Sequence, residues 1–100
     1  MALEAPELNM PSYIVIYIRV RDQGDSLEFE GPYIGKQTVT REEAAKAAKA
    51  VVYDSRHTVT VPNIFEVSDN EELEDVIVRG RKYFDRIKRN MEESKEILEH

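Results

Sequence analysis

The chain has 100 residues, the length of one small domain, and its 41% hydrophobic and 34% charged residues are typical of globular rather than disordered proteins. Its net charge of -6 argues against a domain that is drawn as a whole to nucleic acid or to an anionic membrane. The absence of cysteine excludes disulfides, thiolate metal sites and cysteine nucleophiles, and it favours a cytoplasmic location.

Residues 1–11 contain two prolines and show no hydrophobic period, so we expect a flexible leader. The leader lacks a basic segment followed by an apolar one and is not expected to act as a signal peptide. The longest apolar run, residues 13–18, is far shorter than the about 20 residues that span a bilayer, and we expect no membrane partner. We assign residues 12–97 to a single domain and residues 98–100, Leu-Glu-His, to the remnant of a purification tag.

Residues 12–21 alternate in hydrophobicity as a half-buried strand does, and a turn at residues 22–25 leads into a second alternating segment, residues 26–30. One face of the first strand carries Ile14, Ile16, Ile18 and Val20. A four-residue loop places Arg21 opposite Ser26, which brings the apolar residues of both strands to one face. This register pairs Val20 with Leu27, Arg19 with Glu28, and Ile18 with Phe29.

Residues 33–39 are expected to form either a short third strand or an extended loop, because Pro32 and Gly35 disfavour a central strand. A helix is expected to begin at Thr40, since Thr40 and Glu43 have the spacing of a capping box. Alanine dominates the apolar face of this helix, which comprises Ala44, Ala47, Ala48, Val51 and Val52.

Residues 57–61 have the pattern of a strand whose valines face inward and whose threonines face outward. Pro62 indicates that this strand is an edge or that it ends there. Residues 64–67 are expected to form a second short strand or a bulged extension of the first.

The last helix is expected to begin after Ser68 or Asp69 and to reach about Ile97, with acidic residues in its first turn. Its apolar residues recur every three or four positions and make a heptad-like seam. The seam comprises Leu73, Ile77, Gly80, Phe84, Ile87, Met91, Ser94 and Leu98. We expect its first half to dock on the sheet, whereas the half that begins at Met91 either frays or pairs with another chain.

These elements predict a small α+β domain in the order β-β-(β)-α-β-α. The sheet is expected to be mainly antiparallel, with two helices on one face and a long C-terminal helix. Residues 12–52, a hairpin followed by Gly35-Lys36-Gln37-Thr38-Val39-Thr40-Arg41-Glu42-Glu43-Ala44 and an alanine-rich helix, resemble the β-β-β-α core of HicB-type antitoxins. They are also similar to the arm-binding domain of phage integrases. Both resemblances cover under half of the chain, and no functional residue is carried over from either family.

The last helix segregates its charges, because acidic residues occupy its start and its tail while basic residues occupy its middle. At about 100° per residue, four bases form one stripe opposite the apolar seam. This basic stripe comprises Arg79, Lys82, Arg86 and Arg89. Such a stripe is a candidate contact for nucleic acid or an acidic partner. A solvated outer face is the alternative that we favour, since acids flank the stripe at both ends.

The second face of the first strand carries Tyr13, Val15 and Tyr17, which form a candidate partner or dimer surface, and Met91 of the distal seam belongs to a separate candidate interface. Singly exposed aromatic residues, or a strip covered by the leader, are the alternatives for this face. An antiparallel sheet commonly leaves one face in solvent, which is why the strip is expected to be open.

No catalytic, metal or cofactor motif is visible. His57 is the only interior histidine, and the short sequence distance between Asp54, Ser55 and His57 does not make a triad, because triads assemble in space. A chain with one interior histidine and no cysteine lacks the ligands of a usual zinc site, so we expect no zinc site. The sequence therefore predicts a non-enzymatic protein-interaction module that self-associates or joins a larger complex. The alternative is a small nucleic-acid-binding or regulatory protein that uses the basic stripe.

Overall fold

The computed structural model describes residues 11–99 of the chain, with side chains up to residue 95. The predicted leader therefore lies outside the described residues except for Pro11, and so does His100 of the predicted tag remnant. The described part forms, in chain order, β1 (Ser12–Asp22), β2 (Leu27–Thr38), α2 (Arg41–Val51), β3 (Thr58–Val67) and α3 (Leu73–Glu99). The predicted α+β class, the element order and the long C-terminal helix are confirmed.

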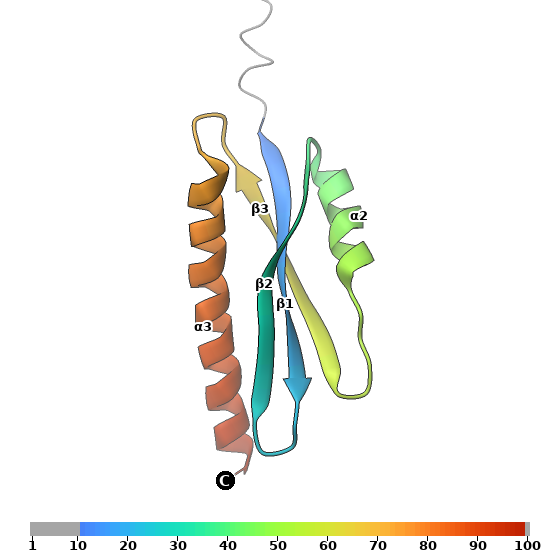
Figure 1. Ribbon diagram of the computed structural model, residues 1–100, viewed down its shortest axis with the longest axis vertical. Coiled ribbons are helices and arrows are strands. Elements are labelled where there is room, and N and C mark those ends of the chain that lie inside the picture. Colours follow the sequence, from blue (N-terminus) through green and yellow to red (C-terminus); the bar gives the residue numbers. More distant parts are fainter. Residues whose placement is uncertain (1–10, 100) are drawn as a thin grey trace, which may run out of the picture.

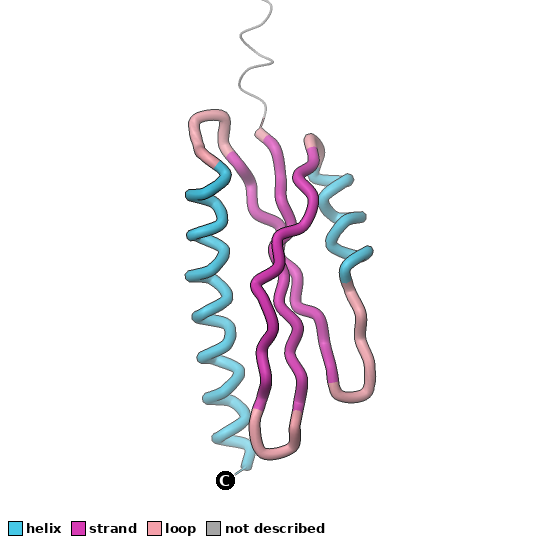
Figure 2. The backbone as a smooth tube through the Cα atoms, viewed as in Figure 1, coloured by secondary structure: helices cyan, strands magenta, loops and turns pink. Residues whose placement is uncertain are grey.

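β1 is the central strand, and both of its neighbours run antiparallel to it in the order β2-β1-β3 (Figures 1 and 2). Its apolar residues on both faces suit this place, since a central strand is covered from two sides. β2 continues through Thr38, so most of the segment that was expected as a strand or a loop is a strand. β3 passes through Pro62 without a break and is an edge strand, which is where proline is tolerated.

The register of the β1–β2 hairpin differs from the predicted one by two residues. It pairs Val20 with Phe29, Arg21 with Glu28, and Asp22 with Leu27. Asp22 causes the shift, because its Oδ1 accepts the backbone N–H of Gly24 at 2.9 Å and thereby confines the turn to residues 23–26. A shift of two keeps every side chain on its predicted face, so the apolar face was correct and only the partners were wrong.

α3 covers the isoleucine face of the sheet and makes the main core with it. The core consists of Ile14, Ile16, Ile18, Val20, Phe65, Val67, Val76 and Phe84. Gly80 lies at a close approach of helix to sheet, since a Cβ at this position would lie 2.5 Å from the Cδ1 of Ile16. The seam is also rotated from the predicted one: Val76 is fully buried, while Leu73 is 39% exposed.

α2 lies on the opposite face of the sheet from α3 (Figure 1), so the expectation that both helices share one face does not hold in this respect. The reason is Val15, which points away from the isoleucines and is completely buried, as is Ala44 of α2. Thr60 of β3 lies on the same side and is buried rather than exposed. Its hydroxyl is satisfied there, because it donates to the carbonyl of Tyr53 at 3.0 Å. The alanine-rich face of α2 lets the helix approach the sheet closely.

Candidate groove between the last helix and an edge strand

α3 crosses the sheet obliquely, from one edge strand toward the other. Before its midpoint, Tyr83 packs edge-on against Phe65 of β3 with ring centroids 5.6 Å apart. Further along, the Nζ of Lys88 lies 5.9 Å from the ring centroid of Phe29 in β2. At its far end α3 lies beside the hairpin turn that joins β1 and β2 (Figure 1). The half of β3 nearest that turn therefore has no helix above it on this face.

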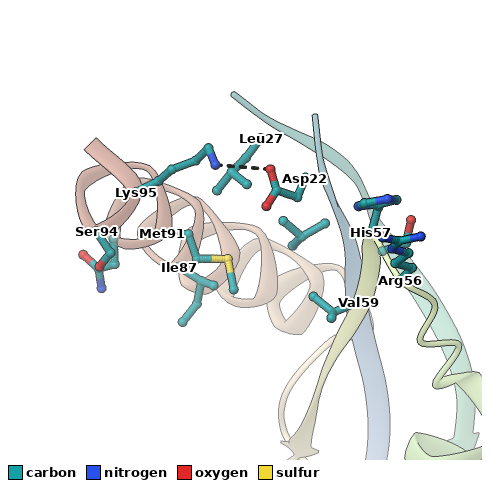
Figure 3. A pocket seen from close by; sticks show the side chains of 12 residues that line it. Asp22, Leu27, Arg56, His57, Val59, Ile87, Met91, Ser94 and Lys95 are labelled. Carbon is teal, nitrogen blue, oxygen red and sulfur yellow. Dashed lines mark hydrogen bonds and ion pairs between the residues drawn. The ribbon is translucent and has the colours of Figure 1, made fainter. Parts of the chain in front are cut away.

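An open groove of about 600 Å³ results between the distal half of α3 and the start of β3 (Figure 3). Its floor and walls are apolar and come from four elements: Val20, Leu27, Val59, Ile87 and Met91. Val59 was expected to face the core, and it does lie on the core side of the sheet. It is nevertheless 44% exposed, because α3 does not cover this part of β3. An exposed apolar groove of this kind is a candidate binding surface.

An ion pair closes one end of the groove. The Nζ of Lys95 lies 3.2 Å from the Oδ1 of Asp22, which ties α3 to the hairpin turn (Figure 3). The hydrogen bond from the Gly24 N–H, followed by the one from Lys95, holds the pKa of Asp22 below its ordinary value of 3.8. Arg56 and His57 lie at the opposite rim, on the side of β3, so the open side of the groove is bordered by basic residues.

The outer edge of β3 is closed to strand addition. The N–H of Asp22 donates to the carbonyl of His57 at 2.8 Å, so every second residue of β3 from Thr58 onward turns its backbone groups away from β1. The segment after α2 occupies these groups: Ser55 N–H donates to the Thr58 carbonyl at 2.8 Å, and Asp54 accepts from the Thr60 N–H at 3.1 Å. Proline at position 62 removes the next donor. These contacts are typical of a protected edge.

These contacts explain why Asp54, Ser55 and His57 lie close together in the sequence. Each of them makes a hydrogen bond that involves the backbone of this turn. His57 is exposed at the groove rim. It lies near enough to the Asp22 carboxylate to make a small electrostatic contribution to the lowered pKa of Asp22. Among the described residues, no three histidine, aspartate or glutamate side chains gather as a metal site.

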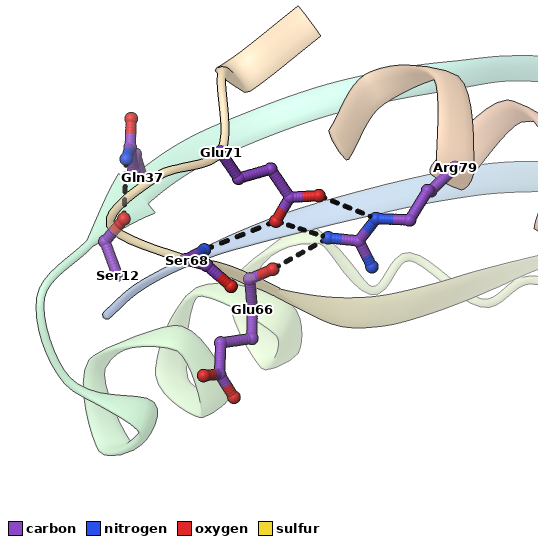
Figure 4. A network of polar contacts seen from close by, with 6 residues as sticks. All are labelled: Ser12, Gln37, Glu66, Ser68, Glu71 and Arg79. Atoms are coloured by element: carbon purple, nitrogen blue, oxygen red, sulfur yellow. Dashed lines mark hydrogen bonds and ion pairs between the residues drawn. The ribbon is translucent and has the colours of Figure 1, made fainter. Parts of the chain in front are cut away.

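The basic stripe loses one of its four members to a structural contact. Arg79 donates from Nε and Nη2 to the two carboxylate oxygens of Glu71 at 3.0 and 2.9 Å, and from Nη2 to the carbonyl of Glu66 at 2.9 Å (Figure 4). Glu71 in turn accepts the N–H of Ser68 at 3.3 Å, so the network fixes the connection between β3 and α3. Lys82, Arg86 and Arg89 are exposed and make no ion pair with a described residue.

The predicted strip on the second face of β1 is partly covered by α2. Val15 is completely buried and is not available as a contact surface in this chain, which corrects its assignment as an exposed residue. Tyr13 and Tyr17 are half-buried. Met91, the fourth predicted interface residue, lies in the wall of the groove. The structure thus separates Met91 from the two tyrosines, which lie on the opposite face of the sheet.

Sequence patterns missed the groove, because it depends on the angle at which α3 crosses the sheet. They also missed the contacts of Arg19, whose guanidinium carbon lies 5.5 Å from the ring centroid of Tyr17 and 5.8 Å from that of Tyr33. The alternation of Tyr17 with Arg19 on one face was a signal for such a cluster, but Tyr33 was not assigned to the neighbouring strand.

The chain was compared with protein-family models, with curated proteins and with solved structures, and no match was found. The resemblances of residues 12–52 to HicB-type antitoxins and to the integrase arm-binding domain therefore gain no support. Among the described residues, neither helix has the length and apolar character needed to cross a membrane.

Proposed function

We propose that the chain is a non-enzymatic protein-interaction module that associates with a second copy of itself through the groove between α3 and β3. The observation that carries the proposal is the groove itself, where a strand residue, Val59, stays exposed beside Ile87 and Met91. Burial of such a surface is the usual source of association free energy. The cytoplasm is the location that we propose for this module, since the chain lacks cysteine.

The occupant that fits the groove is a helix rather than a strand. Backbone pairing along the start of β3 is blocked by Asp54 and Ser55, so an occupant has to bind through its side chains. The distal half of α3 offers a segment of the right kind, because Met91 and Ser94 lie on the groove side while Glu92 and Glu93 are exposed.

Charge complementarity favours that occupant. The open rim of the groove carries Arg56 and His57, and the distal turns of α3 carry Glu92 and Glu93, while Lys95 in the same turns is paired with Asp22. In a two-fold arrangement each groove receives the distal α3 of the other copy, so the complementary charges are used twice. A helix with basic residues on its flank would instead meet the like charges of Arg56 and His57.

Support for a non-enzymatic role comes from the groove lining. Five of its lining residues are aliphatic or thioether side chains, which carry no acid–base chemistry, and no hydrogen bond joins the side chain of His57, which also lines the groove, to Asp22 or Ser94. The polar groups at its rim are occupied in part by the ion pair between Asp22 and Lys95.

Replacing Val59 tests the proposal. Val59→Glu places a carboxylate in the groove, and we expect it to weaken self-association by about 2 kcal/mol or more, since a charge would be buried without a partner. Sedimentation velocity over a concentration series measures the change. Because Val59 is 44% exposed, the folding of the single chain is expected to change little.

The matched control is Val78→Glu, which replaces a valine of nearly equal exposure, 46%, on α3 outside the groove. We expect this variant to associate like the unmodified chain. Equal loss of association in both variants, or a chain that stays monomeric at high concentration, would contradict the proposal.

A further inference from the structure

We propose that a second site, on the α2 face of the sheet, binds a monocarboxylate with a flat aromatic body through Arg19. The site is an open basin of about 730 Å³ below the end of α2, where this face of the sheet has no helix over it. Its lining includes Tyr17, Arg19, Arg21, Glu30, Tyr53 and Thr58. It lies on the opposite face of the sheet from the groove and does not depend on self-association.

Aromatic rings, rather than carboxylates, hold the guanidinium of Arg19 in place. Tyr17 and Tyr33 have ring centroids 5.3 Å apart, and the guanidinium lies within cation–π distance of both. The Nε of Arg19 is buried without a hydrogen-bond partner. No hydrogen bond or ion pair joins the side chain of Arg19 to any of the described residues, although the side chain of its neighbour Arg21 makes two ion pairs. A guanidinium fixed in this way is ready to bind an anion with its terminal nitrogens.

The surrounding charges favour a monoanion. Arg21 is 3.6 Å from Glu28 and 3.7 Å from Glu30, so those two acids are already directed to it. Arg19, Arg21 and Glu30 line the basin, and the neighbouring Glu28 makes this group of four neutral, while the whole chain carries -6. One carboxylate adds a single negative charge beside Arg19, whereas a phosphate dianion or a polyanion adds more than the arginine offsets. The planar fork of a guanidinium also matches a carboxylate bidentately.

The size and walls of the basin favour an aromatic body on that carboxylate. A volume of about 730 Å³ is far larger than a simple ion needs and lies in the range of small-molecule sites. Tyr53, which is 64% exposed, borders the basin from the segment after α2. Tyr33 is not a lining residue of the basin, but its hydroxyl donates to the lining residue Glu30 at 3.4 Å and its ring lies beside Arg19. Flat rings are the ligand surface that tyrosine side chains stack on.

The probe for this site is benzoate, added to the full ¹⁵N-labelled chain and followed by NMR. We expect saturable shifts centred on Tyr17, Arg19 and Tyr33, with a dissociation constant on the order of 1 mM. Arg19→Lys keeps the charge but removes the fork and is expected to weaken binding about tenfold. Arg56→Lys, in the rim of the groove, is the matched control and is expected to leave binding unchanged.

Three further probes define the ligand class. Benzamide, the neutral analogue, and acetate, which lacks the ring, are expected to bind far more weakly than benzoate, and inorganic phosphate is expected not to compete. Equal binding of acetate would overturn the aromatic part of the proposal, and tighter binding of phosphate would overturn the monoanion part. Absence of saturable benzoate shifts, or an unchanged dissociation constant in a folded Arg19→Lys variant, would overturn the site. In the event that Arg19→Lys does not fold, Tyr33→Leu at the sheet edge provides the same test.

Discussion

A single hydrogen atom in place of a side chain decides how closely α3 approaches the sheet. Gly80 faces the fully buried Ile16, and any larger residue would displace the Cδ1 of that isoleucine. Glycine inside a helix costs about 1 kcal/mol relative to alanine, so its presence is unfavourable for the isolated helix. The close contact of helix and strand that it permits offsets this cost.

Gly80→Ala measures that balance. The helix gains about 1 kcal/mol of propensity, while overpacking against Ile16 costs about 1–3 kcal/mol, and we expect net destabilisation because Ile16 is fully enclosed. Chemical denaturation gives the free energy of unfolding. The control is Gly80→Ala combined with Ile16→Val, since valine lacks the Cδ1 atom. Additive effects of the two changes would show that this contact is not responsible.

Asp22 makes the hairpin end of the molecule sensitive to acid. Its pKa is lowered in the folded chain, so its contribution to stability is present above the ordinary value of 3.8 and is lost as the pH falls through the folded pKa. We expect the unmodified chain to be more stable than Asp22→Asn at neutral pH, with the difference vanishing in strong acid. Thermal unfolding of both proteins across pH checks this. A difference that stays constant with pH would contradict the role of the charged carboxylate.

At the scale of the elements, the alternation of β1 and the capping chemistry of α2 were sufficient to predict their structure. Thr40 caps α2 as expected, accepting the N–H of Glu43 at 3.1 Å. The hairpin partners were not predictable from hydrophobicity, because a shift of two residues leaves the apolar face unchanged and only the Asp22 turn decides between the registers. The same pattern did not indicate that α2 crosses to the second face, where Val15 needs a cover.

The outer face of α3 provides the prediction at this scale. Arg79 is engaged with Glu71, and the three remaining bases of the stripe belong to a chain of net charge -6, so we expect them to be solvated. An electrophoretic mobility assay at low salt is expected to detect no complex with duplex DNA or single-stranded RNA. A salt-sensitive complex that Lys82→Glu with Arg86→Glu abolishes would establish the alternative function instead.

At the scale of the whole molecule, one helix on each face of a three-stranded sheet leaves part of both faces uncovered. The α3 face is left with the apolar groove beside Val59, and the α2 face with the basin around Arg19. Neither surface was predictable from sequence periodicity, because each exists only where a helix diverges from the sheet or ends. The predicted residues Tyr17 and Met91 do border these surfaces, one on each face.

The most direct test of the proposed self-association is a crosslink between two copies. The chain has no cysteine, so Val59→Cys in one preparation and Ser94→Cys in another each introduce a single thiol. After mixing and treatment with a short thiol-reactive crosslinker, we expect a covalent heterodimer. A mixture in which Val78→Cys replaces Ser94→Cys is predicted to give none. Equal yields from both mixtures, or no heterodimer from the first, would contradict the claim that the groove receives the distal α3 of a second copy.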